Sequence, residues 1–344
     1  MEENCKYYDV VIVGAGPGGL RCAEFLSKSN KSVLMLEKNE KIGPKVCAGG
    51  ISRKTRKLLK IPPELIKKTF QNIIFKTNSL ESKLKFGEDY MYTVDREELG
   101  QWQLKKLDDS GVEIRIGANV TKIEKECLII NDTEKIKFHY LVGADGSNSI
   151  VRRHLGLKTK KLGVAFQYLV PKIYPDFEIY FNSKLFSYWY SWIFPKGEYT
   201  SIGFGCSPYI LPMKKARENF EIWAKKNSID ISQGKFEAHP INCDYQGYRF
   251  GKIFLIGDAA GFTSGFTGEG IYQALVSGEE VAKLIINSAY RSKRIPKLRR
   301  EVYLHNFMLC VIGCAGPLRN LVFNWVVFCV KSKFLSRTLL RVLT

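Results

Sequence analysis

The 344-residue sequence lacks several signals that would assign a function at once. Its nine cysteines include no CxxC pair, so neither a zinc ribbon nor a four-cysteine iron–sulfur site is indicated, and we expect no metal. The cysteine number is odd without framework spacing, and the N-terminus has no apolar signal region. Internal repeats and low-complexity tracts are also missing. We therefore expect a globular protein of the reducing cytosol.

Acidic residues are scarce relative to basic ones, since 53 Lys and Arg stand against 34 Asp and Glu. The formal charge of +19 favours anionic partners, but it does not choose among nucleic acid, a membrane surface and a phosphorylated substrate. Basic clusters occur at 53–60 and 291–300 without any nucleic-acid-binding motif. We therefore expect no nucleic-acid partner.

The first part of the chain alternates between strand and helix patterns. A β-branched run over 8–13 ends in glycine, residues 19–28 have helical composition, and 32–36 resume as a strand, which is a βαβ unit. A helix is then predicted over 99–110, with strands over 112–116, 127–130 and 138–142. The alternation predicts a mixed α/β domain.

The pattern changes between about residues 163 and 206. Aromatic and β-branched segments predict an antiparallel sheet with strands at 165–170, 177–181, 187–194 and 200–204. A buried strand at 253–256 and a helix at 270–288 then return to the first pattern. The predicted fold class is therefore α/β with an α+β insertion: a Rossmann-like domain over 1–75, 95–160 and 245–290, an interleaved antiparallel-sheet substrate domain over 76–94 and 161–244, and a helical segment over 291–344.

The C-terminal tail from 307 to 344 is apolar and basic. Pro317, Arg319 and Asn320 split it into pieces too short for the roughly 20 residues that span a bilayer, so no transmembrane helix is predicted. The piece 321–330 is followed by the cations Lys331, Lys333, Arg337 and Arg341. It fits either an interfacial membrane helix or a helix packed on the protein, and both interpretations stay open.

A dinucleotide fingerprint follows the first predicted strand. Its residues are Gly14, Gly16, Pro17, Gly18 and Gly19. The pattern GxGxxG between strand and helix lets a pyrophosphate approach the helix N-terminus, where a side chain would block it. Glu37 closes the next strand, where its carboxylate can accept hydrogen bonds from an adenosine ribose. We expect dinucleotide binding, although an unrelated glycine turn has part of the same pattern.

Two later acids separate FAD from NAD. Asp258 follows a strand and is flanked by glycines, and Gly268, Gly270 and Ile271 lie just before the next helix. An Asp there can bind a ribityl hydroxyl, and the helix N-terminus can stabilise negative charge on a reduced isoalloxazine ring. Asp145 occupies a similar turn after the strand that ends at Gly143. The alternative to FAD binding is that both acids lie in turns and contact only solvent.

These motifs in this order, GxGxxG, Gly-Ala-Asp-Gly and Gly-Asp-Ala-Ala, resemble the group-A type of flavoproteins over about residues 8–285. Segments 45–52, 94–99 and 190–195 are similar to the cysteine loop, the Asp-Arg segment and the prenyl-pocket signature of the geranylgeranyl reductases. The sequence departs from those motifs at Ala48 and Ser187. The resemblance implies FAD as cofactor and a prenyl double bond as substrate.

The resemblance also implies which residues surround the flavin. Beyond the residues above, the implied FAD contacts are Lys38, Lys45, Cys47, Ala48, Gly49, Arg96, Val120 and Gly146. Cys47 is expected in the active site as a proton donor or flavin neighbour, with an inert buried thiol as the alternative. The implied substrate pocket is formed by Tyr190, Trp192, Phe194 and Pro195. By strand periodicity 190, 192 and 194 share one face, which an ordinary sheet core would also explain.

The sequence thus predicts an FAD-dependent reductase that saturates geranylgeranyl chains of an isoprenoid lipid. An external donor, NAD(P)H or a ferredoxin-like protein, would reduce the FAD. One alternative is another enzyme, an FAD-dependent aromatic monooxygenase. A second alternative is a membrane-associated flavin-binding electron-transfer protein. We expect a cytoplasmic location, with peripheral contact at the inner face of the cell membrane as an open alternative.

Overall fold

The computed structural model describes residues 5–331. An eight-stranded sheet has the order β17-β18-β11-β1-β2-β8, and β10 and β9 extend it from β11. These strands are β1 (Tyr7–Val13), β2 (Val33–Leu36), β8 (Glu113–Arg115), β9 (Val120–Ile123), β10 (Cys127–Ile130), β11 (Glu134–Gly143), β17 (Arg249–Phe250) and β18 (Ile253–Leu255). β18, β11, β1, β2 and β8 run parallel.

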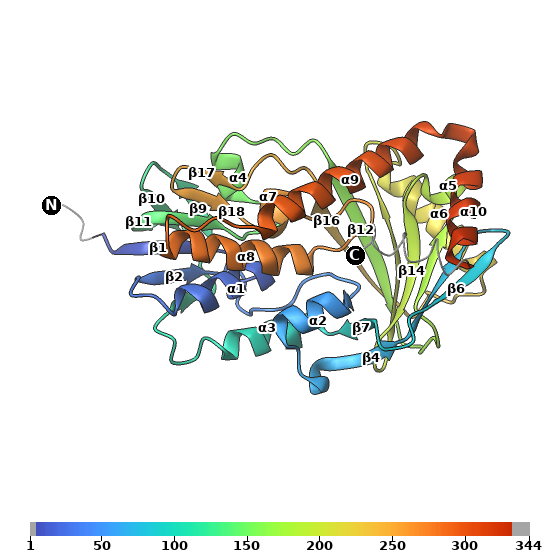
Figure 1. Cartoon of the computed structure of the whole chain (residues 1–344), viewed down its shortest axis with the longest axis horizontal. Helices are drawn as coiled ribbons and strands as arrows, with labels where there is room; N and C mark the ends of the chain where they lie inside the picture. Colours follow the sequence, from blue (N-terminus) through green and yellow to red (C-terminus); the bar gives the residue numbers. More distant parts are fainter. Residues whose placement is uncertain (1–4, 332–344) are drawn as a thin grey trace.

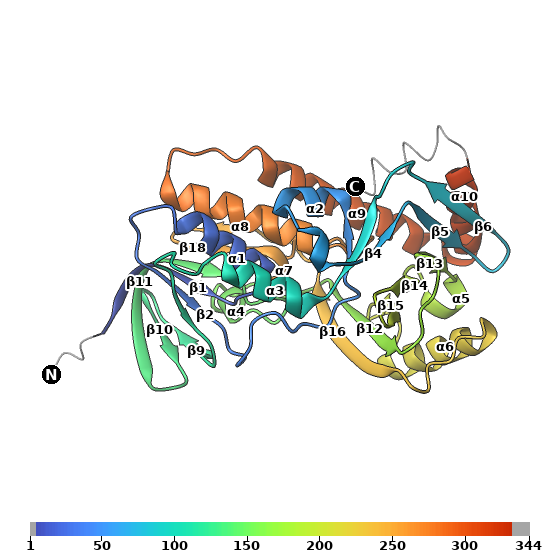
Figure 2. The ribbon, with the colours of Figure 1, turned by 90° about the horizontal axis from the view of Figure 1, so that it is seen from below.

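β1 is apolar because both of its faces are covered. Val10 and Ile12 point into a core built with α1 (Pro17–Leu26), whereas Val11 and Val13 point into a second core on the other face. α1 packs along α8 (Ile271–Ile286), and the two helices lie side by side in Figure 2. α3 (Arg96–Lys105) packs on α1 as well. Helices α1 and α8, which are far apart in the sequence, thus contribute to one core.

A seven-stranded sheet forms the other half of the molecule (Figure 1). Its order is β16-β12-β15-β14-β13-β5-β6, and all pairs are antiparallel except β13 with β5. The strands are β5 (Asn72–Lys76), β6 (Glu81–Lys85), β12 (Leu162–Val170), β13 (Glu178–Phe181), β14 (Tyr190–Pro195), β15 (Thr200–Cys206) and β16 (Lys235–Asn242). Phe166, Phe204 and Phe220 pack α6 (Met213–Lys226) against it.

A three-stranded sheet connects the two halves. It consists of β3 (Gly50–Ser52), β7 (Met91–Val94) and β4 (Ile66–Phe70), with α2 (Arg53–Leu59) following β3 directly. Two short helices, α4 (Ile150–His154) and α7 (Gly257–Ala260), follow β11 and β18. The antiparallel sheet therefore enters the parallel domain as an insertion, as the change of sequence pattern predicted.

The C-terminal part forms α9 (Arg294–Cys314) and α10 (Arg319–Lys331). Arg319 fixes the bend between them, because its guanidinium donates to the carbonyls of Ile312 at 3.0 Å and Gly313 at 2.8 Å. Within residues 5–331 no single helix is long and apolar enough to cross a membrane; α9 and α10 qualify only as a pair bent by 108°. The predicted split of the tail is confirmed, while Lys333, Arg337 and Arg341 lie outside the described residues.

Several predicted boundaries differ from the structure, among them the start of the strand predicted over 138–142, which begins at Glu134, and two starts have a clear local cause. The helix expected from 99 begins at Arg96, because the Asp95 carboxylate accepts hydrogen bonds from the N–H groups of Glu97 and Glu98 at 2.8 and 3.2 Å. The strand expected from 187 begins at Tyr190, because residues 183–186 form α5 (Ser183–Phe186), capped by the Asn182 side chain.

Candidate active site

Four parallel strands bring the predicted cofactor residues to one edge of the sheet. Val13 lies opposite both Leu36 and Gly143, and Gly143 lies opposite Leu255. The turns after these four residues therefore meet at the carboxyl ends of the strands, which is where open α/β sheets bind ligands. The glycine loop, Glu37, Asp145 and Asp258 come together in this way, although up to 244 positions separate Gly14 from Asp258.

The glycine loop fits a closely approaching anion. Gly14 has φ +101°, and a Cβ there would lie 2.5 Å from the carbonyl oxygen of Ala144 on the neighbouring strand. At Gly16, by contrast, the nearest atom to a Cβ would be the Ala144 carbonyl oxygen at 3.9 Å, and Gly16 precedes α1 without any side-chain cap. The first N–H groups of α1 are therefore available to an anionic ligand. Glu37 holds the loop, since its Oε2 accepts a hydrogen bond of 2.9 Å from the N–H of Ala15.

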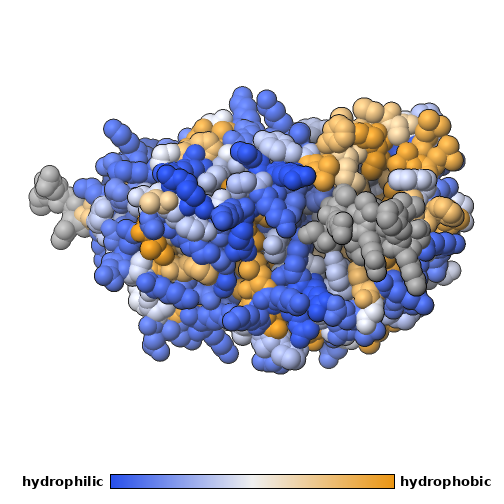
Figure 3. Space-filling model, viewed as in Figure 1, coloured by the Kyte–Doolittle hydropathy of each residue, from blue (hydrophilic) through white to orange (hydrophobic). Residues whose placement is uncertain are grey.

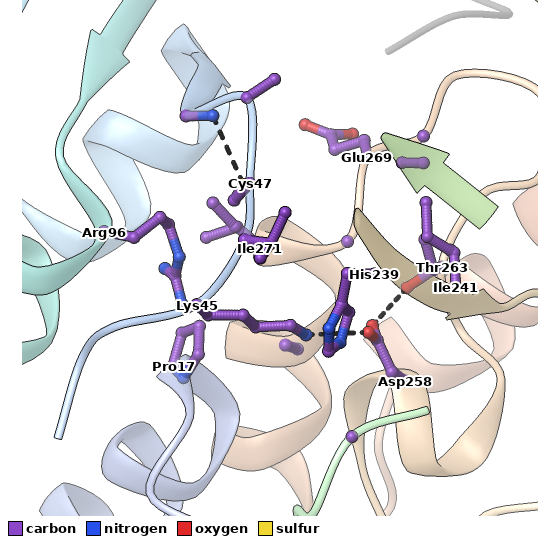
Figure 4. A pocket seen from close by; sticks show the side chains of 18 of the residues that line it. Pro17, Lys45, Cys47, Arg96, His239, Ile241, Asp258, Thr263, Glu269 and Ile271 are labelled. Carbon is purple, nitrogen blue, oxygen red and sulfur yellow. Dashed lines mark hydrogen bonds and ion pairs between the residues drawn. The ribbon is translucent and has the colours of Figure 1, made fainter. Parts of the chain in front are cut away.

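Asp258 is the centre of a charged cluster, shown in Figure 4. Its Oδ2 lies 3.1 Å from Lys45 Nζ and accepts a hydrogen bond from Ser147, and its Oδ1 accepts one from Thr263. Burial by itself raises the pKa of Asp258, but Lys45 and Thr263 outweigh it and the pKa stays below its ordinary value. Burial and then the nearby Lys45 lower the pKa of His239 to about 4. Near neutral pH this cluster therefore holds an anionic Asp258 and a neutral His239.

Several buried polar atoms of the cavity lining lack a partner within residues 5–331, among them one of Asp145 and one of Arg96. Asp145 accepts hydrogen bonds from the N–H groups of Ile150 and Val151 through Oδ2, but its Oδ1 has none. Burial raises the pKa of this carboxyl. One guanidinium nitrogen of Arg96 is likewise unsatisfied. Because orphaned buried polar atoms are rare, these two indicate a polar ligand, and the hydroxyl and phosphate groups of FAD fit them.

The loop before β3 crosses from the parallel domain to the antiparallel sheet. Cys47 lies in it, and its Sγ accepts a hydrogen bond of 3.3 Å from the N–H of Gly49. Opposite the loop, Glu269 precedes α8; it forms an ion pair of 2.7 Å with Lys54 and accepts a hydrogen bond from Ser52. The loop and the N-terminus of α8 thus form two sides of one space (Figure 4).

This space continues into an aromatic compartment over the seven-stranded sheet. Phe177 and Phe194 stack with their ring centroids 3.8 Å apart, next to Gly50, the first residue of β3 after the crossing loop. The farther walls are apolar side chains of β5, β6, β13, α9 and α10: Ile73, Phe75, Leu84, Ile179, Phe181, Phe307, Met308, Val311, Ile312, Val322, Trp325 and Val326. The whole cavity measures about 1510 Å³, whereas a site for one small molecule usually measures about 300–1,000 Å³. It has room for a cofactor and a second ligand.

The structure brings nearly all predicted site residues to this cavity. The expected cofactor residues line it except Gly19, whose Cβ position lies 2.1 Å from the Gly14 carbonyl oxygen behind the loop. Tyr190, Trp192 and Phe194 line it from one face of β14, as the strand periodicity predicted. Pro195 does not line it, and its carbonyl accepts a hydrogen bond from Thr93.

Two titratable residues that bear on the chemistry of the cavity, His239 and Lys196, are not among the residues that the sequence predicts. His239 comes from β16, whose sequence carries no motif. Lys196 directly follows the 190–195 segment, and that adjacency was the one signal that could have found it.

Comparisons with known proteins agree with this geometry. A family model described as FAD binding domain matches residues 7–220. The chain is 32% identical over 296 residues to an uncharacterized protein of Methanosarcina barkeri, covering 82% of this chain and 76% of that protein. It is 28% identical over 329 residues to the digeranylgeranylglycerophospholipid reductase of Methanocaldococcus jannaschii, covering 88% and 83%.

Solved structures share the fold. A geranylgeranyl bacteriochlorophyll reductase-like protein from Thermoplasma acidophilum superposes with a TM-score of 0.83 at 21% identity, covering 96% of this chain and 93% of that one. PqsL, a probable FAD-dependent monooxygenase from Pseudomonas aeruginosa, gives 0.71 at 17% identity, covering 94% and 100%. The resemblance read from the motifs is confirmed: the chain belongs to the FAD binding domain family of FAD-dependent oxidoreductases, among relatives that include geranylgeranyl reductases.

Proposed function

We propose that the protein is an FAD-dependent reductase that saturates geranylgeranyl double bonds of an isoprenoid lipid. The observation that carries the proposal is the continuity of one cavity from the glycine loop and Asp258 to the aromatic compartment. A ligand that reaches from that compartment to the crossing loop has to be long and apolar. Named relatives that are digeranylgeranylglycerophospholipid or geranylgeranyl diphosphate reductases support the same substrate class.

FAD would be held at the polar end of the cavity. The α1 N-terminus and Gly16 would bind the pyrophosphate, Glu37 the adenosine ribose, and Asp258 a ribityl hydroxyl. When bound and reduced, FAD supplies a hydride to an alkene carbon. The remaining residues of the predicted set would surround it from the walls on which they lie: Pro17, Gly18, Lys38, Lys45, Ala48, Gly49, Arg96, Val120, Asp145, Gly146, Gly268, Gly270 and Ile271.

The aromatic compartment would orient the prenyl chain and exclude water. Tyr190, Trp192 and Phe194 form a row on β14, and the Tyr190 hydroxyl donates to the carbonyl of Thr267 beside the start of α8. Cys47 lies where the compartment meets the polar end, which supports a place near the reacting double bond. Unchanged alkene reduction by a pre-reduced Cys47→Ala protein would remove the thiol from the reaction.

A membrane contact would deliver such a substrate. Half of the exposed large hydrophobic side chains among residues 5–331 lie on α9, α10 and the short turn η2 (Gly316–Leu318) between them, and we call this group the apolar platform: Tyr303, Leu304, Phe307, Val311, Leu318, Leu321, Trp325 and Phe328. It occupies the orange area at the upper right of Figure 3, where Figure 1 places α9 and α10. Phe307, Val311 and Trp325 also line the cavity, so the cavity reaches the platform.

Cations border the platform. Lys297, Arg299 and Arg300 are exposed on the first half of α9, and Lys331 is exposed at the end of α10. An apolar surface with a cationic border fits an anionic lipid surface. We therefore place the protein at the inner face of the cell membrane, with the lipid entering between α9 and α10.

The decisive experiment for the activity is anaerobic. Purified protein with bound FAD is reduced with dithionite and mixed with geranylgeranyl lipids, and flavin reoxidation is followed together with product mass. We expect reoxidation coupled to a gain of two hydrogens per double bond. If no prenyl lipid gains mass, the reductase proposal is wrong; NADPH oxidation with oxygen uptake on an aromatic substrate would support the monooxygenase instead. Comparing NAD(P)H with a reduced ferredoxin identifies the electron donor.

Vesicle flotation tests the membrane contact. The protein should float with phosphatidylglycerol vesicles more than with phosphatidylcholine vesicles, and Trp325 fluorescence should shift to the blue. Leu321→Glu with Phe328→Glu should abolish flotation while FAD binding is retained. Ile222→Glu on α6, a residue that is 53% exposed outside the platform, is the matched control. Equal flotation of all variants would contradict the contact.

A further inference from the structure

Lys196 is a buried ammonium group in the cavity. The residue is 3% exposed, and within residues 5–331 it forms no ion pair. Its Nζ lies 2.8 Å from the Cβ position of Gly49, in the loop that carries Cys47. Phe194, two residues earlier, stacks on Phe177 at the entrance of the aromatic compartment. Lys196 therefore lies at the junction of the polar and the apolar ends of the cavity.

An isolated buried ammonium is costly, so its surroundings have to explain why it is there. Burial lowers the pKa of Lys196, and Arg96 acts in the same direction. Cys47, Asp95 and Glu237 act against this and do not cancel it. The structure thus holds an ammonium that gives up its proton more readily than an exposed lysine does.

A hydrogen-bonded chain joins Lys196 to the outside. Lys196 Nζ donates to the Tyr199 hydroxyl at 3.4 Å, and that hydroxyl donates to Asp95 Oδ2 at 3.2 Å. Tyr199 and Asp95 are both partly exposed. Burial, followed by the neighbouring Asp95, raises the pKa of Tyr199, so the hydroxyl stays protonated and can relay a proton. The chain leads from solvent to the junction of the cavity.

We propose that Lys196 is the general acid that delivers the proton in alkene reduction, and that solvent resupplies it through the Tyr199 hydroxyl, which Asp95 orients. This inference rests on the proposed function. Saturation of one C=C bond adds a hydride to one carbon and a proton to its neighbour. The hydride comes from reduced FAD, which is oxidised. The proton comes from Lys196, whose N–H bond breaks as the C–H bond forms and whose neutral amine then takes a proton from solvent water through the partly exposed Tyr199 hydroxyl. Burial raises the pKa of Asp95, but backbone hydrogen bonds and Lys196 outweigh it and hold that pKa below its ordinary value, so Asp95 is ionised and orients the hydroxyl.

Two substitutions separate proton delivery from charge. Lys196→Arg keeps the positive charge but cannot release a proton near neutral pH, whereas Lys196→Met keeps the length and removes both. A general acid contributes about 10²–10⁴-fold. We therefore expect both variants to slow lipid-driven flavin reoxidation by about 10²-fold or more, and Lys68→Arg, outside the cavity, to match the wild type. Full activity of Lys196→Arg would overturn the proposal in favour of a purely electrostatic or headgroup-binding role.

An NMR titration of the lysine side chains tests the proposal without measuring catalysis. In protein with ¹³C-labelled lysine and no lipid, the side-chain resonance missing from Lys196→Arg belongs to Lys196. Its midpoint should lie below those of the exposed lysines, and Asp95→Asn should lower it further because a neighbouring carboxylate is lost. A midpoint equal to that of exposed lysines would overturn the proposal. If wild-type protein reduces no prenyl lipid, the proposed function has failed, and the titration still reports on Lys196.

Discussion

The close packing of α1 on α8 predicts opposite effects for two Gly→Ala substitutions in helices. Gly278 is buried in α8, and a Cβ there would lie 2.2 Å from the carbonyl oxygen of Gly18 in α1, the helix that follows the glycine loop. Gly313 in α9 has room, because its Cβ would lie 3.7 Å from the nearest atom, in the ring of Tyr188. Alanine is favoured over glycine in a helix by about 1 kcal/mol at either position.

At Gly278 the clash of the added Cβ with the Gly18 backbone outweighs the better helix propensity of alanine, so the substitution lowers the free energy of unfolding. Overpacking costs about 1–3 kcal/mol, and the upper end applies because the obstacle is backbone rather than a flexible side chain. Gly278→Ala should therefore lower the free energy of unfolding by about 2 kcal/mol, whereas Gly313→Ala should raise it by up to about 1 kcal/mol. Gly278→Ala should also weaken FAD binding by about tenfold, since shifting the start of α1 costs about 1.5 kcal/mol of hydrogen bonding to the anion.

Urea unfolding of the apoprotein measures the first effect, and quenching of FAD fluorescence on binding measures the second. Gly313→Ala is the control for helix propensity, and it should leave FAD affinity unchanged. If Gly278→Ala proves as stable as Gly313→Ala, or binds FAD as tightly as the wild type, then the contact of α1 with α8 does not position the glycine loop, and the reasoning is refuted.

Three further predictions follow from the site. Glu37→Gln should weaken FAD binding by about 10- to 150-fold, since a charge-assisted hydrogen bond to the loop is worth about 1.5–3 kcal/mol, and fluorescence titration measures it; unchanged affinity would contradict this role. Because the pKa of His239 is about 4 in the folded protein against 6.5 ordinarily, its stabilising contribution is complete above pH 6.5 and lost as the pH falls to 4. Apoprotein stability should fall over that range by at most about 3 kcal/mol more in the wild type than in His239→Gln, and parallel urea curves would argue against it. Ile179→Trp should fill the aromatic compartment and slow lipid-driven reoxidation without changing FAD affinity, so equal reoxidation rates would show that the prenyl chain lies elsewhere.

Local sequence determined the parallel domain and its cofactor residues. The runs that end at Val13, Leu36 and Leu255 are apolar because both faces of their sheet are covered, and this pattern is readable without any distant contact. The carboxyl ends of parallel strands meet at one edge, so acids that follow those strands are expected to converge. For this reason the sequence alone predicts that Glu37, Asp145 and Asp258 belong to one site.

Tertiary structure alone decided how the cavity is completed. β5 and β6 belong to the seven-stranded sheet, and α9 and α10 close the apolar end of the cavity. These contacts depend on how distant segments pack together, and no local hydrophobic periodicity of the sequence predicts them. Lys196 looks in sequence like one more surface lysine among many, and only burial beneath the Cys47 loop sets it apart. The sequence by itself determined the flavin site, because its motifs are local; the lipid compartment and the buried ammonium depend on which segments fold over them.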